Sequence, residues 1–261
     1  MGWPAAVTQG VCSATARPAH RSPSQNHSAT GATSHFRCDR EPQGRRVERL
    51  FGVAVDLSGN VFVAEFGNWR VQKFDNNGGF ITSWGGFGIG NGHFVAPCGV
   101  AVDTNGNVFV ADTGSSLIEK FTNDGTFLTS WGSMGSGDGQ FSYAQGVAVD
   151  GNGNVFVVDA LDSRVQKFDN SGNFLTAFGS GQLSGPTWVA VDGSGNVLVS
   201  DTLNERVVKF DNNGNFIATW GGPGNGDGQF FDAEGIAVDG DRDVFVADNN
   251  DNNRVQKFSC P

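Results

Sequence analysis

From residue 51 to residue 258, short apolar runs alternate with clusters of glycine, asparagine and aspartate. The runs are about five residues long and rich in valine and phenylalanine, which favour extended strands. The clusters between them hold the residues that most readily form tight turns and adopt positive φ. This alternation predicts a series of short antiparallel strands joined by hairpin turns.

The same set of runs occurs five times. Gly-Val-Ala-Val-Asp or a variant opens each repeat, and the closing aspartates are separated by 47, 47, 42 and 47 residues. A Val-Phe-Val run and an Arg-Val-Gln-Lys-Phe run follow, and the first four repeats add a run that ends in tryptophan or phenylalanine. Internal periods of this length are typical of repeat folds. We expect the repeats at about 51–94, 95–141, 142–183, 184–230 and 231–261.

Each repeat is predicted to be a four-stranded antiparallel meander, which cannot bury both of its faces alone. Units of this size stack radially as the blades of a propeller. The fourth run of the first four repeats ends in a large aromatic residue that is expected to fill the space between blades; these residues are Trp84, Trp131, Phe178 and Trp220. The fold class predicted from the sequence is therefore all-β, a β-propeller of five four-stranded blades.

The repeated runs resemble the NHL repeat. The linkers Gly135–Phe141 and Gly224–Phe230, Gly-x-Gly-Asp-Gly-Gln-Phe, resemble those of bacterial-type NHL proteins. The resemblance covers residues 51–260 and implies a β-propeller, which in this family is commonly six-bladed. This chain departs from that pattern, because it has five repeats and the fifth stops after its third run at Phe258.

Residues 1–46 differ from the propeller domain expected over 47–261. Residues 1–38 contain no acidic residue and are rich in alanine, serine, threonine and arginine, without a periodic apolar pattern. We expect a largely disordered leader or tail; a targeting peptide and a wrongly assigned start are the alternatives. Thr33-Ser34-His35-Phe36 faintly matches the fourth run of the first repeat, so residues 30–37 are predicted to supply a closing strand. An open array that needs a partner is the alternative.

Charge and composition exclude several classes of function. Residues 1–50 hold 7 arginines against 3 acidic residues, whereas residues 51–261 hold 10 basic against 24 acidic residues. An acidic body is a poor match for a phosphate backbone, so no nucleic-acid partner is expected. No stretch approaches the roughly 20 apolar residues of a membrane span. The four cysteines form no C-x-x-C pair, which argues against a zinc knuckle.

The carboxylates of the repeat have structural interpretations. The Asp-x-x-Gly-Asn turns lack the glutamate of a full calcium loop and are predicted to be hairpin turns. The aspartate or glutamate that ends the second run precedes an arginine in four repeats, which predicts an ion pair that braces a loop. The second repeat has Leu117 in place of this arginine.

The sequence offers little that suggests catalysis. Lyase relatives of the family need histidines from several blades to hold zinc, but His93 is the only histidine after residue 35. We therefore expect no enzyme activity, no metal and no cofactor. The alternative is a lactonase- or lyase-like enzyme with a divalent cation in the central channel. A truncated gene product without a function of its own is a third alternative.

Two sets of loops vary between repeats, whereas the strands do not. One set precedes the first strand and the other joins the second and third strands, so both are expected on one face. Candidate ligand-binding residues on this loop face are Phe66, Trp69, Tyr143, Leu161, Trp188 and Glu234. NHL domains of known proteins act as interaction modules, so the sequence predicts a monomeric, non-enzymatic scaffold for a protein, peptide or glycan. The alternative is that these residues only cap the blades.

Overall fold

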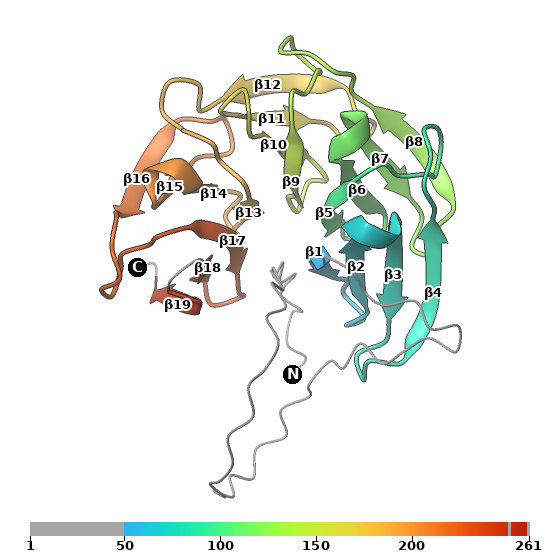
Figure 1. The fold of residues 1–261 in the computed structure, drawn as a ribbon, viewed down its shortest axis with the longest axis horizontal. Coiled ribbons are helices and arrows are strands. Elements are labelled where there is room, and N and C mark those ends of the chain that lie inside the picture. The colour runs from blue at the N-terminus through green and yellow to red at the C-terminus, as the bar shows by residue number, and fades with distance from the viewer. Residues whose placement is uncertain (1–49, 250–251, 260–261) are drawn as a thin grey trace, which may run out of the picture.

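The repeated runs form strands in the computed structural model, which describes residues 50–249 and 252–259. The predictions made for residues 1–46, including the closing strand at 30–37, lie outside the described residues. Figure 1 shows five sheets arranged around a common centre. In each sheet the strands follow chain order from the centre outwards. The all-β, five-bladed propeller predicted from the sequence is confirmed.

The five blades have the following strands. Blade 1 consists of β1 (Leu50–Val55), β2 (Val61–Glu65), β3 (Arg70–Phe74) and β4 (Phe80–Gly85). Blade 2 consists of β5 (Pro97–Val102), β6 (Val108–Asp112), β7 (Leu117–Phe121) and β8 (Phe127–Trp131). Blade 3 consists of β9 (Ala144–Val149), β10 (Val155–Asp159), β11 (Arg164–Phe168) and β12 (Phe174–Phe178). Blade 4 consists of β13 (Val189–Val191), β14 (Val197–Asp201), β15 (Arg206–Phe210) and β16 (Phe216–Gly221). Blade 5 consists of β17 (Ala233–Val238), β18 (Asp243–Asp248) and β19 (Arg254–Ser259).

The turn between the first and second strands is held by its own aspartate. In blade 1, Asp56 Oδ1 accepts the backbone N–H groups of Ser58 and Asn60, both at 2.9 Å, and Asp56 Oδ2 accepts the Asn60 side-chain amide. Gly59 supplies the positive φ of 81° that the turn requires. The same bonds form at the turns that begin with Asp103, Asp150 and Asp192. The prediction of structural hairpin turns is confirmed.

The apolar core lies between blades rather than within them. The face that a blade turns toward the following position in the chain is called its trailing face here, and the opposite face, turned toward the preceding position, its leading face; the trailing face of one blade packs against the leading face of the next. Between blades 1 and 2, Phe62 and Val71 of the trailing face meet Val110 and Phe121 of the leading face. Trp84 lies 5.8 Å from the ring of Phe121, as expected for an aromatic residue that fills the space between blades. Equivalent clusters join blades 2 and 3, 3 and 4, and 4 and 5.

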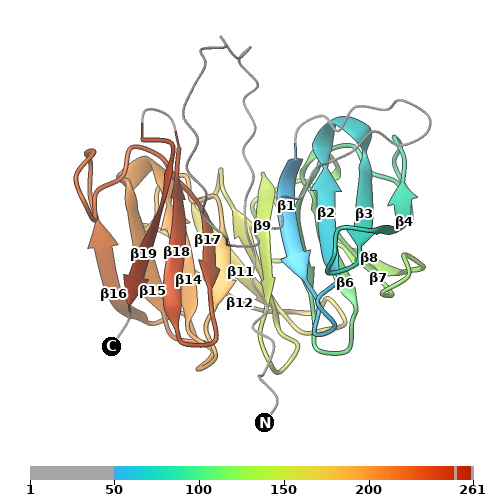
Figure 2. The same ribbon diagram turned by 90° about the horizontal axis from the view of Figure 1, so that it is seen from below.

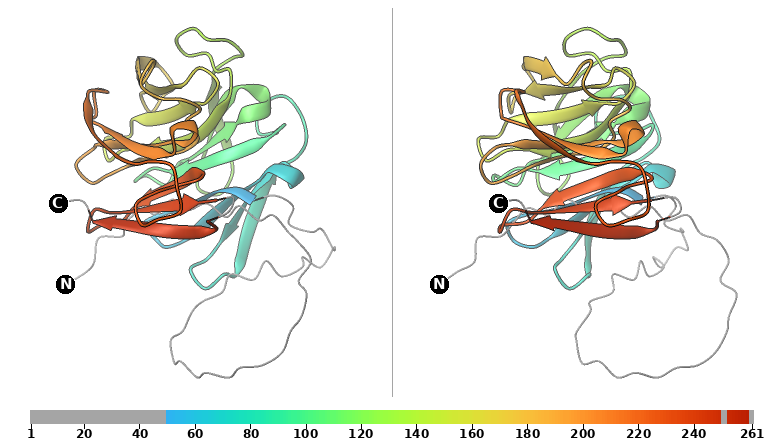
Figure 3. Two further views of the ribbon diagram at one scale, coloured as in Figure 1. Left: turned by 60° about the vertical axis from the view of Figure 1, so that its left-hand side comes forward. Right: turned by 90° about the vertical axis from the view of Figure 1, so that its left-hand side faces the viewer.

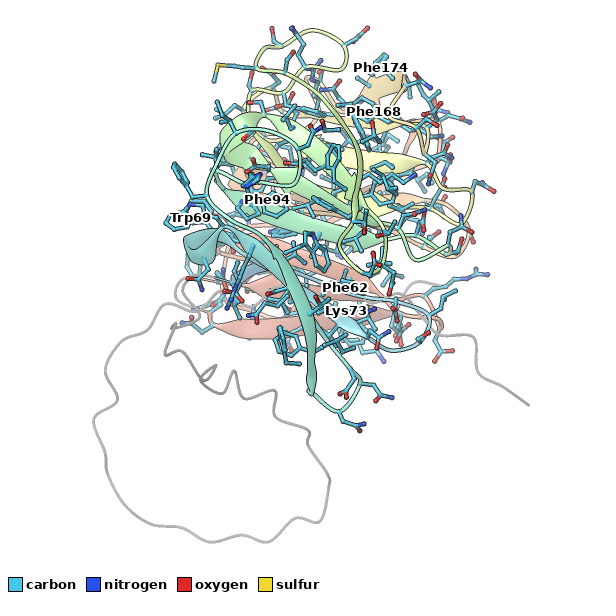
Figure 4. All side chains as sticks on the ribbon, turned by 90° about the vertical axis from the view of Figure 1, so that its right-hand side faces the viewer. Phe62, Trp69, Lys73, Phe94, Phe168 and Phe174 are labelled. Atoms are coloured by element: carbon cyan, nitrogen blue, oxygen red, sulfur yellow. The ribbon has the colours of Figure 1, made fainter. Side chains whose placement is uncertain are left out.

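A polar clamp also joins blade 1 to blade 2, blade 2 to blade 3 and blade 3 to blade 4, on the face away from the variable loops. Lys73 of blade 1 donates to the main-chain oxygen of Asn123 in blade 2 at 3.3 Å and to its side-chain oxygen. The Asn123 amide donates in turn to Asp56 Oδ2 of blade 1 at 3.2 Å. Figure 4 shows Lys73 beside Phe62, whose ring its ammonium group covers at 5.3 Å. The same clamp occurs as Lys120–Asn170–Asp103 and as Lys167–Asn212–Asp150.

Candidate functional site

The variable loops gather on one face of the propeller, called the loop face here. Strand pairing places the start of the first strand opposite the end of the second, for example Pro97 opposite Asp112 and Ala144 opposite Asp159. The loop face therefore comprises two sets of connections that the structure describes. One set precedes the first strands, at 86–96, 132–143, 179–188 and 222–232; the other joins second and third strands, at 66–69, 113–116, 160–163 and 202–205. Figure 2 shows the strands of all blades running between this face and the opposite one.

Buried carboxylates brace these connections. In blade 3, Asp159 Oδ1 accepts the backbone N–H groups of Ser142 and Tyr143, both at 3.0 Å. Its other oxygen lies 3.2 Å from Arg164 Nη2, and Arg164 Nη2 also donates to the main-chain oxygen of Gln140 at 3.0 Å. Because charged hydrogen bonds of this kind are strong and the aspartate is fully buried, the loop has little freedom.

The predicted ion pair between the second and third strands is confirmed in four blades. The pairs are Glu65–Arg70 at 3.1 Å, Asp159–Arg164 at 3.2 Å, Asp201–Arg206 at 2.7 Å and Asp248–Arg254 at 3.1 Å. The carboxylate is fully buried in every pair. Arg164, Arg206 and Arg254 also donate to main-chain oxygens of the preceding connection, so these charges stabilise the loops of the fold.

Blade 2 departs from this pattern and holds two buried carboxyl groups. Leu117 replaces the arginine, and Glu119 stands where blades 1, 3 and 5 have a glutamine. Glu119 is 1% exposed, and its Oε2 accepts the backbone N–H of Gly92 at 2.8 Å. Burial, with a smaller contribution from the charge of Asp112, raises the pKa of Glu119 to about 7. Glu119 was not among the residues predicted from the sequence, although the exchange is visible when the five repeats are aligned.

The nearby thiol is not poised to react. Cys98 is buried at the start of β5. Burial and, to a smaller extent, the charge of Asp112 raise the pKa of its thiol to about 11, although a hydrogen bond with Thr113 acts in the opposite direction. A cysteine is nucleophilic as the thiolate, so this side chain is inert near neutral pH.

Aromatic side chains emerge from the loop face at blade 1. Trp69 is 38% exposed and lies in the left-handed region with φ of 53° at the end of η1 (Phe66–Asn68). Its ring contacts that of Phe87 at 5.2 Å, and Phe87 is itself 68% exposed. Phe66 is half-buried and packs on Phe51 at 5.3 Å. Figure 4 shows Trp69 projecting from the molecule, in contrast to Phe62 between the sheets. Phe87 was not among the residues predicted from the sequence.

A second exposed group lies at blade 3. Leu161 is 72% exposed, and Tyr143 lies beside the same connection because its main-chain oxygen accepts the N–H of Ala160 at 3.0 Å. Burial is the main cause that raises the pKa of the Tyr143 hydroxyl. Leu203 of blade 4 and Phe231 before blade 5 are also exposed, and sequence reasoning missed both.

The remaining two predicted residues lie in different surroundings. Trp188 is only 5% exposed and belongs to the core between blades 4 and 5, so the structure corrects its assignment as an exposed anchor. It occupies the position of the first-strand glycine in other repeats, such as Gly146, where a Cβ would lie 2.8 Å from the backbone of the neighbouring blade. Glu234 is half-buried and accepts a hydrogen bond from Asn249. Burial and the charge of Asp232 raise the pKa of Glu234.

The described residues show no grouping that suggests a metal centre. Among residues 50–249 and 252–259, no three histidine, cysteine, aspartate or glutamate side chains come together as metal ligands. His93 is exposed in the connection 86–96, where its side chain lies next to Gly86 and Gly88. No helix in the described part of the chain is long and apolar enough to cross a membrane.

Comparison with known proteins gives a family and a fold. The model of the NHL repeat matches residues 94–121, 141–168 and 232–258. No curated protein matches the chain significantly.

Several solved structures share the fold at low sequence identity. Virginiamycin B lyase from Staphylococcus aureus has a TM-score of 0.60 and 13% identity, over 83% of this chain and 71% of the lyase. A streptogramin B lyase has a TM-score of 0.57 and 14% identity, over 85% of this chain and 75% of the lyase. The WD40 propeller domain of Doa1 has a TM-score of 0.55 and 14% identity, over 78% of this chain and 61% of that domain.

These similarities overturn one prediction made from the sequence. The chain was predicted not to be an enzyme, but two of the similar structures are lyases, so this fold accommodates enzymes as well as binding domains. The prediction erred because it took the absence of one histidine-based zinc site as evidence against catalysis in general. The matches to the repeat model, together with the five-bladed architecture, show that the chain is an NHL-repeat β-propeller protein.

Proposed function

We propose that the chain is a binding module that holds a protein, peptide or glycan ligand on its loop face. The observation that supports this proposal most directly is the set of exposed apolar side chains on braced loops. Trp69 with Phe87 at blade 1, and Tyr143 with Leu161 at blade 3, are 38–72% exposed, although buried carboxylates hold the loops that carry them. Large aromatic and aliphatic side chains of this kind supply most of the energy of protein interfaces.

The hydrogen bonds that hold these loops matter because a mobile loop loses conformational entropy when a ligand immobilises it, and this loss lowers the affinity. Loops tied down by Asp159 and Arg164, and by Asp201 and Arg206, are already ordered before a ligand arrives. A preorganised surface therefore keeps more of its contact energy as affinity. The strands and the opposite face are nearly identical between repeats, whereas the loop face differs from blade to blade, as a surface for one specific ligand requires.

The charge of the loop face favours a ligand with cationic groups. Asp232 and Glu234 have raised pKa values, in each case mainly through burial and then through neighbouring carboxylates. The described arginines of this region are engaged by carboxylates of their own blades. A lysine or arginine side chain of a ligand at this point lowers the repulsion between the two carboxylates. The proposal concerns binding, and it holds whether or not the bound ligand is then transformed.

The test uses the full chain as bait for a random-peptide display library and for a glycan array. Each ligand found is then measured against two loop-face variants, Leu161→Asp and Trp69→Ser. Serine is the residue that blades 2 and 3 carry at the position of Trp69, in the same left-handed conformation, so this variant keeps the local fold. The matched control is Leu57→Asp, which places the same charge at an exposed leucine in a hairpin turn of the opposite face.

We expect at least one loop-face variant to weaken binding about tenfold or more, which corresponds to about 1.4 kcal/mol. The control is expected to bind as the wild type does. Ligands that bind all four proteins equally, or libraries that yield no ligand, contradict the proposal.

A further inference from the structure

The two end blades leave equivalent faces uncovered. The strands of blade 5 pair in the same register as those of blade 1, in which Ala54, Phe62, Ala64 and Val71 form the trailing face. The corresponding trailing face of blade 5 consists of Ala237, Phe245, Ala247 and Val255. Val255 is 67% exposed, whereas Val71, Val165 and Val207 at the same position of blades 1, 3 and 4 are 0% exposed. Four clusters join successive blades, but within the described residues no core cluster joins blade 5 to blade 1. Figures 1 and 3 show the sheets following one another in chain order, with blades 1 and 5 at the two ends of the row.

The leading face of blade 1 is the corresponding free surface at the other end. Its residues are Val53, Val55, Val61, Val63 and Phe74, and all of them are half-buried. The equivalent residues of blade 2, Val100, Val102, Val108, Val110 and Phe121, are all buried against blade 1. The same side chains therefore form a core wherever a trailing face is present to meet them.

The polar clamp is divided between these two free faces. Blade 5 has Lys257 and Asp239, which correspond to the lysine and the turn aspartate that bind an asparagine of the following blade in blades 1, 2 and 3. Blade 1 has Asn76, the asparagine that such a pair grips, and it stands exposed. Lys257 instead pairs with Asp243 at 2.6 Å and covers the ring of Phe245 at 5.4 Å. Each free face thus carries the half of the clamp that the other one lacks.

We propose that the trailing face of blade 5 binds the leading face of blade 1 of a second copy of this chain. The contact repeats the interface that already joins the blades inside one chain, with valines and Phe74 against Phe245 and Val255. Lys257 and Asp239 of one copy grip Asn76 of the other. Because the contact joins two different faces, it is a head-to-tail association, which continues into a ring or an open filament.

Sedimentation velocity of the full chain over a range of concentrations tests this proposal. Two variants each disable one face: Val255→Asp places a charge in the trailing face, and Asn76→Lys opposes Lys257 at the leading face. Both residues are exposed, so neither change disturbs a core, and circular dichroism of each variant checks that the fold is kept. Leu161→Asp is the matched control, because it introduces the same charge at an equally exposed leucine of the loop face.

We expect the wild type and Leu161→Asp to reach masses above that of one chain as concentration rises, and each face variant to stay monomeric. An equimolar mixture of the two face variants is expected to form dimers and nothing larger, because each partner retains one intact face. A wild type that stays monomeric at every concentration overturns the proposal and indicates that the faces are covered within one chain. A mixture of the two variants that stays monomeric overturns it as well.

Discussion

Replacing Glu119 by glutamine restores in blade 2 the residue that blades 1, 3 and 5 carry at the same position. In blade 3, Gln166 accepts the backbone N–H of Gly139 at 2.9 Å, as Glu119 accepts that of Gly92. Gln166 also donates to Asp159 at 3.4 Å, a bond that a glutamate cannot make when it is ionised. The variant therefore keeps the shape of the site and removes only the titrating group.

The size of the effect follows from the pKa of Glu119. Burial raises this pKa from 4.5 to about 7, so the folded protein holds a proton that the unfolded chain releases. A group with a raised folded pKa stabilises the fold below its unfolded pKa, and this stability is lost as the pH rises through 7. At about 1.4 kcal/mol per pH unit, the loss between pH 4 and pH 8 amounts to about 3 kcal/mol.

Urea unfolding of the wild type and of Glu119→Gln, measured at each pH from 4 to 8, tests this reasoning. We expect the stability difference in favour of the variant to grow by about 3 kcal/mol over this range. The difference between the two proteins cancels the titration of the other carboxylates, such as Asp56 and Asp192, whose pKa values are lowered. A difference that stays constant from pH 4 to pH 8 refutes the assignment of a buried, titrating carboxyl group at this position.

Three further changes test the contacts between blades by urea unfolding. Phe121→Ala empties the space beside Trp84 and is expected to cost about 3–5 kcal/mol; a cost below about 1 kcal/mol indicates that this ring is not buried. Gly125→Ala is expected to cost more than about 1 kcal/mol, because φ is +91° and a Cβ there lies 2.6 Å from the ring of Trp84. Asn170→Ala removes the side-chain oxygen that Lys120 binds and the amide that donates to Asp103, and is expected to cost about 1–2 kcal/mol, unlike Asn105→Ala at an exposed turn residue, which serves as its control.

The strands and turns could be predicted from the sequence because local rules determine them. Runs such as Val108–Val110 alternate between two buried faces, and the turn at Asp56 closes with hydrogen bonds to residues two and four positions on. The ion pair between Asp159 and Arg164 also joins residues that are five positions apart. Such contacts lie within one repeat, so five repeats of the pattern were sufficient to indicate them.

Contacts between different repeats could not be predicted from such local patterns. The clamp joins Lys73 to Asn123 and Asn123 to Asp56, over 50 and 67 positions, and each of these residues alone looks like an ordinary solvated turn residue. Trp188 was taken for a surface anchor because it follows a loop, whereas the neighbouring blade covers it. Phe87 was not predicted as a loop-face residue because Trp69, whose ring it contacts edge to face, lies in another connection.

Hydrogen–deuterium exchange with and without a ligand from the peptide library or glycan array tests the central claim most directly. Exchange reports which backbone amides a ligand covers or stiffens along the whole chain. A ligand held on the loop face is expected to slow exchange in the connections 66–69, 86–96, 132–143 and 160–163. Slower exchange confined to the hairpin turns of the opposite face, such as 56–60 and 103–107, would contradict the assignment of the loop face as the binding surface.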